Sequence, residues 1–485
     1  MKLSCLCQGI EIAETNLESL DIEVNRICGD SRRVEDNDVF ISIRGNSYNG
    51  HKYIGEALCR RAAVIVIDDR DYAGDFPYIR VSSTRRAYAH MWNNFCGRPS
   101  QRLKYIAVTG TNGKSSCVSM IAHILNSSNI KCGDIGTLNS ELTTPDPPQL
   151  YPRLSELADR GCRYAVLEAS SHALEYEKLS ALHMDIGVFT NLTCEHLDFH
   201  PNMYSYAEAK AKLFSRCDTG IYNRDDKYGS MVSRGAAHRL SYSFRNDCAD
   251  YVCRNIRTGI GNCSFDFLTV GKLFRIRLPH TGRFSIYNAM AACSTAYYMG
   301  ISPEDIQNAL SCMPVISGRL EEVELDFADY RVFIDYAHTP DAMSKVLSAL
   351  RECMGREGRL TCVFGCGGNR DPKKRAPMGA IATMLADRVI ITSDNSRDEA
   401  VFDIIRDILR GVDKTRNYMV IPDRRGAIRY AVHTAQKSEV IVFCGKGHEN
   451  YEINRFGKIP FIEKDIIQEA HKERIERSKN EHNSC

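Results

Sequence analysis

The stretch YIAV-TGTNGKS at residues 105–115 decides the fold of this chain. Its first four residues are apolar and rich in β-branched side chains, which predicts a buried strand. Apolar residues then recur at helical spacing after the lysine, at Cys117, Val118, Ile121, Ile124 and Leu125. A strand, a turn of small residues and a helix in this order predict an α/β fold with a phosphate-binding loop.

The turn itself has the residue types that phosphate binding needs. Small residues let backbone N–H groups close around phosphate oxygens, and the helix N-terminus favours an anion. Lys114 would reach the β and γ oxygens, and Ser115 could ligate magnesium. The full Walker pattern has a glycine where this chain has Val108, so the loop is a variant. A tight strand–helix turn with a chance lysine is the alternative.

Apolar runs with intervening helical patterns divide the 485 residues into three expected domains. Residues 1–100 predict a small α/β unit, and residues 97–101 a linker. Residues 101–328 predict a central P-loop-type parallel-sheet ATPase domain, and residues 329–485 a Rossmann-like C-terminal domain. The expected strands are 39–43, 62–67, 78–81, 105–108, 164–167, 186–189, 332–334, 360–364, 389–391 and 440–444.

Polar clusters follow many of these strands directly. They occupy residues 109–115, 168–172, 190–191, 335–338, 365–371, 394–399 and 445–449. In open parallel sheets, ligands bind outside the carboxyl ends of the strands. The pattern therefore predicts a cleft between domains in which a two-substrate enzyme could work.

Composition excludes several other classes of protein. The net charge is +2 without a dense basic run, which argues against binding along a nucleic-acid backbone. No apolar stretch reaches the roughly 18 residues of a membrane helix, and no signal-peptide core follows the start. The 20 cysteines are scattered without a zinc-type pattern. We therefore expect a cytoplasmic protein with reduced thiols and no membrane insertion.

The loop 110–115 closely resembles the signature of the Mur ligases and of their relatives, the folylpolyglutamate synthases. Further motifs extend the resemblance along nearly the whole chain. They are DSR at 30–32 with Gly45 and GH at 50–51, TTP at 143–145, EASSH at 168–172, TNL at 190–192, EHLD at 195–198, AK at 209–210, DYAHTP at 335–340 and GKGHE at 445–449. So many motifs in one order make a chance match very improbable.

The resemblance implies ATP and Mg²⁺ as cofactors and an acyl phosphate as the activated intermediate. It implies catalytic roles for Lys114, Glu168, His196 and Lys210. The metal ligands would be Ser115, Glu168, His196 and Lys210, the last as a carbamate, with Lys212 as the rival position. The implied ATP-binding residues are Gly110, Thr111, Asn112, Gly113, Lys114, Ser115, Ser116, Asn288, Arg319 and Asp335. Ser285 replaces an asparagine usual in the family, which puts one nucleotide contact in doubt.

The resemblance also implies where the two other substrates bind. The residues for the UDP-muramoyl dipeptide would be Ser31, His51, Thr143, Thr144, Ser170, Tyr176 and Lys178. Tyr176 and Lys178 stand where relatives often have glutamine and arginine. The residues for diaminopimelate would be Arg370, Asp394, Asn395, Arg397, Gly445 and Glu449. Family members that add diaminopimelate carry the motif DNPR, and here it reads DNSR at 394–397.

The kept Arg397 matters because a guanidinium binds a carboxylate through two parallel hydrogen bonds. Diaminopimelate has a carboxylate at its distal end, whereas lysine does not. We therefore expect an enzyme that adds meso-diaminopimelate to the D-glutamate of UDP-N-acetylmuramoyl-L-alanyl-D-glutamate, in peptidoglycan precursor synthesis, as a monomer. The alternatives are the same reaction with L-lysine, a folylpolyglutamate synthase-like ligase, and a non-catalytic protein that keeps the fold.

Overall fold

The computed structural model describes residues 1–45, 48–197, 199–355 and 358–483, with the backbone alone for 478–483. Asp198 of the EHLD motif lies outside the described residues. The chain forms two compact units that each combine several stretches. Unit 1 contains residues 1–110, 125–189 and 204–240, and unit 2 contains residues 111–124, 190–203 and 241–485. The three-domain division of the sequence remains a prediction.

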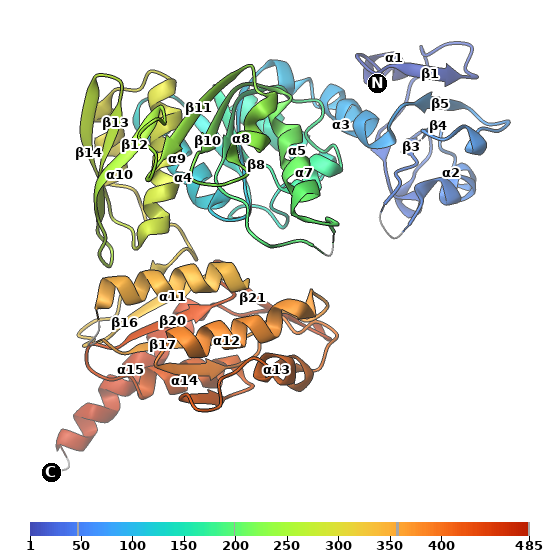
Figure 1. The fold of residues 1–485 in the computed structure, drawn as a ribbon. Coiled ribbons are helices and arrows are strands. Elements are labelled where there is room, and N and C mark those ends of the chain that lie inside the picture. Colours follow the sequence, from blue (N-terminus) through green and yellow to red (C-terminus); the bar gives the residue numbers. More distant parts are fainter. Residues whose placement is uncertain (46–47, 198, 356–357, 484–485) are drawn as a thin grey trace. The chain divides into compact units, whose positions relative to one another are not determined.

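The first part of the chain forms a small five-stranded sheet in the order β1-β5-β4-β3-β2 (Figure 1). Three of its strands confirm predicted ones, although β3 and β4 are shorter than the apolar runs. The strands are β1 Ile12–Thr15, β2 Ile27–Cys28, β3 Val39–Ile41, β4 Val64–Ile67 and β5 Tyr78–Val81. The helices are α1 Leu3–Leu6, α2 Ile54–Cys59 and α3 Thr84–Phe95. Residues Pro99–Gln101 form a 3₁₀ helix, so the predicted linker is partly structured.

A nine-stranded sheet follows, in the order β14-β13-β12-β11-β10-β9-β6-β8-β7. Strands β6 to β10 pair in parallel around β6, which confirms the predicted parallel sheet. Strands β12, β13 and β14 pair antiparallel, an extension that the sequence did not predict. The strands are β6 Lys104–Thr109, β7 Cys132–Ile135, β8 Tyr164–Glu168, β9 Met184–Phe189, β10 Cys217–Asn223, β11 His238–Ser243, β12 Tyr251–Arg257, β13 Cys263–Thr269 and β14 Lys272–Leu278.

The helices of this region begin where the sequence has helix-starting residues. Helix α4 confirms the predicted helix but starts at Lys114, inside the predicted loop, and its apolar stripe from Cys117 to Leu125 is buried. Ser170 caps α6 and Ser302 caps α10 by accepting backbone N–H groups of the first turn. The helices are α4 Lys114–Ser127, α5 Pro147–Asp159, α6 Ser171–Glu175, α7 Met203–Phe214, α8 Gly229–Val232, α9 Arg283–Tyr298 and α10 Pro303–Ser311.

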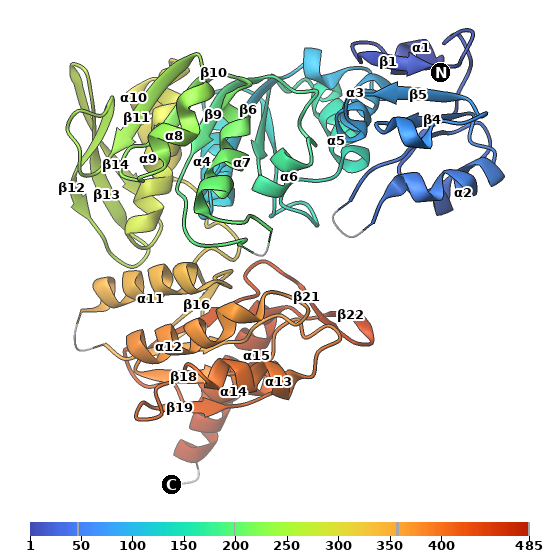
Figure 2. The ribbon, with the colours of Figure 1, turned by 45° about the vertical axis from the view of Figure 1, so that its right-hand side comes forward.

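The C-terminal part is a six-stranded sheet in the order β15-β16-β20-β17-β18-β19, with helices on both faces (Figures 1 and 2). All its pairings are parallel except that of β15 with β16. The strands are β15 Glu321–Glu322, β16 Arg331–Asp335, β17 Leu360–Phe364, β18 Arg388–Ile391, β19 Tyr418–Val420 and β20 Val440–Cys444. The other elements are helices α11 Pro340–Met354, α12 Arg375–Leu385, α13 Val401–Leu409, α14 Arg424–His433 and α15 Glu463–Asn483, and the hairpin β21 Tyr451–Asn454 with β22 Gly457–Pro460.

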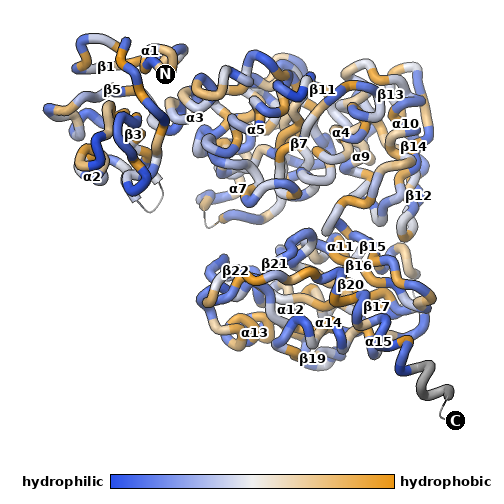
Figure 3. The backbone as a smooth tube through the Cα atoms, turned by 180° about the vertical axis from the view of Figure 1, so that it is seen from behind, coloured by the Kyte–Doolittle hydropathy of each residue, from blue (hydrophilic) through white to orange (hydrophobic). Residues whose placement is uncertain are grey.

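Strand alternation explains why β20 is hydrophobic throughout, as its colouring in Figure 3 shows. In β20, Val440, Val442 and Cys444 pack with α11, α12 and α13, whereas Ile441 and Phe443 pack with α14 and α15. Successive side chains of a strand point to opposite faces, so a sheet covered on both faces needs apolar residues at every position. Every residue of β17, β18 and β20 is buried.

At the start of these strands lies a buried ionic network. Arg388 of β18 donates to Glu439 at 3.0 Å and to the hydroxyl of Thr361 at 3.0 Å. The Thr361 hydroxyl in turn donates to the Glu439 carboxylate. The side chains of Arg388 and Glu439 are 5% and 0% exposed, so their charges compensate each other, and the partly exposed Arg359 lies 3.9 Å from the same carboxylate. The network ties β17, β18 and β20 together at their amino ends.

Arg388→Met is expected to destabilise the protein by up to about 3–5 kcal/mol, because it removes the nearest cation from the buried Glu439 carboxylate and leaves Arg359, at 3.9 Å, to compensate it. The double variant Arg388→Met/Glu439→Leu should recover part of that loss, since no charge is then left unpaired. Urea unfolding of the wild type and both variants measures the difference. A single variant as stable as the wild type would contradict this account of the network.

Candidate functional site

The phosphate-binding loop depends on a close approach between its backbone and helix α9. Gly113 has a φ of +85°, and a Cβ there would lie 2.2 Å from Oδ1 of Asn288. Only glycine fits such a position, because a side chain would meet both the strained φ and the amide. Lys114 donates to the carbonyl of Thr111 at 2.8 Å, which folds the lysine back along the loop. The predicted ATP-binding residues Gly113, Lys114 and Asn288 are thus brought together.

Two polar residues after β9 hold this loop in place. The backbone N–H of Asn112 donates to Oδ1 of Asn191 at 3.1 Å, and Nδ2 of Asn191 donates to the Asn112 carbonyl at 3.0 Å. The hydroxyl of Thr190 donates to the same carbonyl at 2.7 Å. The sequence motif marked residues 190–191, but it did not assign them this role. Their position directly after a strand of the same sheet was the available signal.

Two further residues of unit 2 contact the loop from later in the chain. Arg319 donates to the hydroxyl of Ser115 at 2.9 Å, so these two predicted ATP-site residues lie together. Asp341, at the start of α11, accepts a hydrogen bond from Nδ2 of Asn112 at 2.7 Å. Sequence reasoning missed Asp341, because a carboxylate in the first turn of a helix is also the usual partner of the helix dipole.

Asp335 ends β16 as predicted and is buried. Its two carboxylate oxygens accept the backbone N–H groups of Leu320 and Ala337, both at 2.7 Å. Burial raises the pKa of Asp335 to about 6, although the charge of Arg319 and both hydrogen bonds oppose the rise. The carboxylate therefore joins the segment that carries Arg319 to the end of the sheet. Ser116 and Ser285 are also buried, and the Ser285 hydroxyl donates to the carbonyl of Thr281 at 2.7 Å.

In unit 1, Glu168 ends β8 with its side chain buried. Its carboxylate accepts the backbone N–H of Thr137 at 2.7 Å and the Thr137 hydroxyl at 3.3 Å. A Cβ at Gly136 would lie 2.2 Å from Oε1 of Glu168, so this position needs a glycine. Sequence reasoning missed Gly136 and Thr137, because the short segment after β7 has no motif of its own.

Four of the seven residues predicted for the UDP-muramoyl dipeptide lie together near Glu168. The Thr144 hydroxyl donates to the carbonyl of Glu168 at 2.7 Å and accepts the backbone N–H of Ser170 at 3.1 Å. Thr143 lies next to them and accepts a hydrogen bond from the hydroxyl of Thr137 at 3.3 Å. Lys178 donates to the carbonyl of Thr144 at 3.2 Å. The structure therefore brings Thr143, Thr144, Ser170 and Lys178 to one place.

The two substituted positions have acquired partners of their own. The guanidinium of Arg85 lies 4.1 Å from the centre of the Tyr176 ring, in a cation–π contact. Lys178 forms an ion pair with Asp146 at 2.7 Å. Arg85 and Asp146 are therefore the charged partners of Tyr176 and Lys178 in this chain.

The predicted residues Ser31 and His51 lie in the small N-terminal sheet region. The Ser31 hydroxyl donates to Glu56 at 2.7 Å. The His51 side chain is fully buried between Asn49 and Asp68, at 2.9 and 3.2 Å. An imidazole with both nitrogens engaged holds the surrounding loops together, and a direct contact with substrate remains a prediction.

Lys210 and Lys212 of α7 differ sharply in environment. Lys210 is 1% exposed and donates to the carbonyl of Gly110 at 2.8 Å. Lys212 is half exposed and pairs with Glu175 at 2.6 Å. Residues two positions apart on a helix point in different directions. One of the two lysines can therefore be buried while the other is exposed to solvent. Lys210 is therefore the one of the two that contacts the phosphate-loop segment.

His196 has a left-handed backbone, with φ of +57°, and its side chain is partly exposed beside Glu195 at 3.9 Å. A left-handed backbone conformation is unfavourable for histidine, and strained residues of this kind are often found at functional sites. No cluster of three His, Cys, Asp or Glu side chains with the geometry of a metal site occurs within the described residues. The predicted ligands include only one carboxylate, that of Glu168. This number suits magnesium, because magnesium takes one or two carboxylates and fills its other positions with phosphate oxygens and water.

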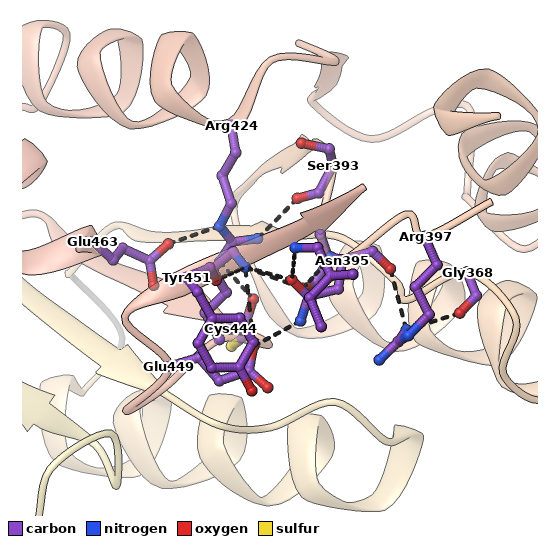
Figure 4. A network of polar contacts seen from close by, with 12 residues as sticks. Gly368, Ser393, Asn395, Arg397, Arg424, Cys444, Glu449, Tyr451 and Glu463 are labelled. Carbon is purple, nitrogen blue, oxygen red and sulfur yellow. Dashed lines mark hydrogen bonds and ion pairs between the residues drawn. The ribbon is translucent and has the colours of Figure 1, made fainter. Parts of the chain in front are cut away.

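The loop after β18 forms a second polar centre, shown in Figure 4. Asn395 is buried and donates from Nδ2 to Glu449 at 2.7 Å. Asp394 is buried beside Lys446, whose Nζ lies 3.7 Å from its Oδ1. Although burial acts in the opposite direction, the charges of Lys446 and Arg424 hold the pKa of Asp394 below its ordinary value. Gly445 has a φ of +114°, and a Cβ there would lie 2.6 Å from Oδ2 of Asp394.

Arg397 lies beside this centre in a strained conformation, with φ of +51°. Its backbone N–H donates to Ile453 at 3.0 Å, which fixes the loop against β21. Its Nη1 donates to the carbonyls of Gly368 and Asn395, at 2.8 and 3.2 Å. Within the described part of the chain, no carboxylate lies within ion-pair distance of this guanidinium.

Arg370 has an exposed side chain that forms no hydrogen bond or ion pair with other described residues. It nevertheless lies near Arg397, because a Cβ at Gly367 would be 3.7 Å from Cγ of Arg370 and 3.0 Å from Nη1 of Arg397. The structure therefore brings the predicted residues Asp394, Asn395, Arg397, Gly445 and Glu449 together, with Arg370 beside Arg397.

The chain is similar to known proteins over nearly its whole length. The chain matches the family model for the Mur ligase middle domain over residues 108–296, and that for the Mur ligase glutamate ligase domain over residues 318–447. A relative from Caldanaerobacter subterraneus subsp. tengcongensis, named UDP-N-acetylmuramoyl-L-alanyl-D-glutamate–2,6-diaminopimelate ligase, is 39% identical over 93% of this chain and 95% of its own. The protein of the same name from Clostridioides difficile is 37% identical over 97% and 99%.

Solved structures show the same fold. A structure of UDP-N-acetylmuramoyl-L-alanyl-D-glutamate–2,6-diaminopimelate ligase is 29% identical, covers 97% of this chain and 99% of its own, and has a TM-score of 0.69. Folylpolyglutamate synthase from Mycobacterium tuberculosis, with 18% identity and a TM-score of 0.62, covers 74% of this chain and 92% of its own. From these matches, the chain belongs to the Mur ligase family of ATP-dependent ligases that form carbon–nitrogen bonds.

Proposed function

We propose that this enzyme adds meso-diaminopimelate to the D-glutamate carboxylate of UDP-N-acetylmuramoyl-L-alanyl-D-glutamate, in peptidoglycan precursor synthesis. The observation that carries the choice of amino acid is the guanidinium of Arg397. Its hydrogen bonds go to two carbonyls, so its positive charge has no carboxylate partner among the described residues. The relatives named for diaminopimelate support the same choice.

The chemistry of the distal head of diaminopimelate matches this site. That head carries an ammonium and a carboxylate on one carbon. Its carboxylate would pair with Arg397, and its ammonium would lie against Glu449 and Asn395. Lysine has no distal carboxylate, so it would leave the guanidinium without compensation in a half-buried pocket.

Amide formation from a carboxylate is uphill in water, so ATP first converts the D-glutamate carboxylate into an acyl phosphate. Phosphoryl transfer needs positioning and cationic stabilisation more than covalent help. Lys114 would hold the β and γ oxygens, and Arg319 would add charge from beside Ser115. The loop residues Gly110, Thr111, Asn112, Gly113 and Ser116 would surround the phosphates, with Asn288 and Asp335 nearby in the nucleotide site.

Magnesium would neutralise charge on the transferred phosphate. Ser115, Glu168, His196 and a carbamylated Lys210 would hold it. For Lys210 this requires a neutral amine, which burial at 1% exposure favours because it penalises the ammonium. Thr137 and Gly136 keep the Glu168 carboxylate in one orientation, and Thr190 and Asn191 keep the loop closed around the phosphate position.

The UDP-muramoyl dipeptide would bind along Ser31, His51, Thr143, Thr144, Ser170, Tyr176 and Lys178. We propose that the reaction takes place in the cytoplasm and that the enzyme acts as a monomer. No helix among the described residues is long and apolar enough to cross a membrane.

A phosphate-release assay with the UDP-muramoyl dipeptide, comparing diaminopimelate, lysine and ornithine, tests the proposal. Preference for lysine would leave only the broader ligase function.

Lys114→Ala is expected to lower kcat by at least about 100- to 1,000-fold, because a preorganised charge at the transferred phosphate is lost. Its melting temperature should stay close to that of the wild type, since the side chain is not part of the core. Lys104→Ala, at the other end of β6 and exposed to solvent, is the control and should stay active. Near-normal turnover by Lys114→Ala would refute the role of the loop.

Lys210→Ala is expected to inactivate the enzyme, and a short-chain carboxylate added to the assay should restore part of the activity by replacing the missing anion. Lys212→Ala is the matched control, because that lysine pairs with Glu175 at the surface. Phosphate release with and without added carboxylate measures both. An inactive Lys212→Ala with an active Lys210→Ala would mean that the carbamate site is misassigned.

Arg397→Lys is expected to lower kcat/KM for diaminopimelate by roughly one to three orders of magnitude, since a point charge cannot reproduce the paired hydrogen bonds. The KM for ATP should change little. Ser396→Pro should be neutral or slightly favourable, because the backbone N–H of Ser396 makes no hydrogen bond among the described residues. Unaltered use of diaminopimelate by Arg397→Lys would overturn the assignment of this motif.

A further inference from the structure

Lys446 is a fully buried cation in the middle of the polar centre after β18. Its side chain is 0% exposed, and its Nζ donates to Oδ1 of Asn395 at 3.0 Å and to the carbonyl of Tyr451 at 2.9 Å. A buried ammonium is costly unless hydrogen bonds and opposite charges compensate it. Neither its sequence motif nor the resemblance assigned a role to this lysine.

The contacts of Lys446 fix the orientation of the Asn395 amide. Oδ1 of Asn395 accepts two hydrogen bonds, from Lys446 and from the backbone N–H of Ile453 at 2.9 Å. Both partners are donors and cannot accept, so only the amide oxygen suits that side. The Nδ2 group must therefore point the other way, where it donates to Glu449 at 2.7 Å. Figure 4 labels Asn395 and Glu449, the two ends of this last hydrogen bond.

Lys446 also lies between the two carboxylates of the centre. Its Nζ is 3.7 Å from Asp394 and 3.9 Å from Glu449. Arg424, the other buried cation here, instead donates to Glu463 and to the carbonyls of Ser393 and Cys444 (Figure 4). Of these two cations, Lys446 is thus the one in contact with the residues proposed for the diamino acid.

We propose that Lys446 is a positioning residue of the amino-acid site, which holds Asn395 and Glu449 in the arrangement that receives the distal ammonium of the diamino acid. This inference rests on the proposed function for the identity of the amino acid. Lys446 acts through Asn395 and Glu449 and does not itself touch the substrate. Its loss should therefore weaken the amino acid specifically and leave ATP and the UDP-muramoyl dipeptide bound as before.

A pH dependence follows from the same contacts. Burial and the charge of Asp394 raise the pKa of Glu449, against the effects of Asn395, Lys446 and Arg397. Tyr336 also lies near, and burial together with the charge of Glu449 raises its pKa to about 12. Glu449 must be ionised to receive an ammonium, so KM for the amino acid should rise as the pH falls through its pKa. Without Lys446 that pKa is higher, and the rise in KM begins at a higher pH.

Three variants of the full-length enzyme test the proposal. Lys446→Met removes both the charge and the hydrogen bond, whereas Lys446→Gln keeps a donor for Asn395 without the charge. Arg388→Met is the matched control, because it removes a buried cation from the start of β18, about 20 Å of extended chain away from Asp394. For each variant, KM for the amino acid, ATP and the UDP-muramoyl dipeptide is measured between pH 6 and 9, with the melting temperature.

The expected result is a KM for the amino acid raised roughly 10- to 100-fold in Lys446→Met, with the other two constants unchanged. Lys446→Gln should show a smaller rise and the same shift of the pH profile. If Lys446→Met does not fold, Lys446→Gln decides the matter. The proposal would be overturned if the Lys446 variants had a lowered melting temperature, as Arg388→Met does, but kept all three KM values and the pH profile of the wild type.

The wild-type enzyme separates this inference from the proposed function. Its comparison of diaminopimelate with lysine establishes which amino acid it uses. The effect of Lys446 is then measured with that amino acid, because both carry a distal ammonium. Preference for lysine would refute the proposed substrate, yet a specific rise in its KM in the Lys446 variants would still support the positioning role.

Discussion

The parallel register of β6 with β8 and β9 is the constraint on which the proposed ATP site depends. Val108 pairs with Glu168 of β8 and with Val188 of β9, so all three strands end at the same edge of the sheet. A shift of one residue between two hydrogen-bonded strands would turn every side chain of the shifted strand to the wrong face of the sheet. The register of the strands, and with it the position of their ends, is therefore fixed. The phosphate-binding loop, the Glu168 carboxylate and the Thr190-Asn191 pair therefore all begin at that edge.

The proposed amino-acid site differs from the loop region because it concentrates charged side chains. The buried Asp394 and the largely buried Glu449 are tolerated since Lys446 lies within 4 Å of both carboxylates. Arg397 also acts on Glu449 through its charge, but its hydrogen bonds go to carbonyls. Two acids, one lysine between them and an arginine without an ion-pair partner among the described residues suit a ligand that brings one ammonium and one carboxylate.

Three glycines allow the backbone to approach polar side chains of the proposed ATP site and of the proposed amino-acid site. Gly113 approaches Asn288, Gly136 approaches Glu168, and Gly445 approaches Asp394, each closely enough that a Cβ would overlap the polar side chain. Each of these side chains belongs to a proposed site, so the absence of a Cβ is what lets the backbone hold it in place. Two of the three glycines lie within motifs of the sequence, whereas Gly136 does not.

The sequence by itself determined the fold class, the phosphate-binding loop and most of the polar residues at the strand ends. These properties are local: a run such as Tyr105–Val108, a helix starting at Lys114 and a glycine-rich turn follow from adjacent residues. The antiparallel strands β12 to β14 escaped prediction because their apolar residues alternate only in part. The choice of Lys210 over Lys212 rests on resemblance and stays a prediction, whereas the difference in burial between the two lysines appears only in the structure.

Only the tertiary structure decided which polar residues work together. Asn112 with Asp341 and Asn395 with Lys446 are far apart in the chain, at separations of 229 and 51 residues. No periodicity connects such pairs, because they meet only when the strands and helices between them have packed. Burial is likewise a property of the whole fold, and it alone distinguishes the buried Lys446 from an ordinary surface lysine.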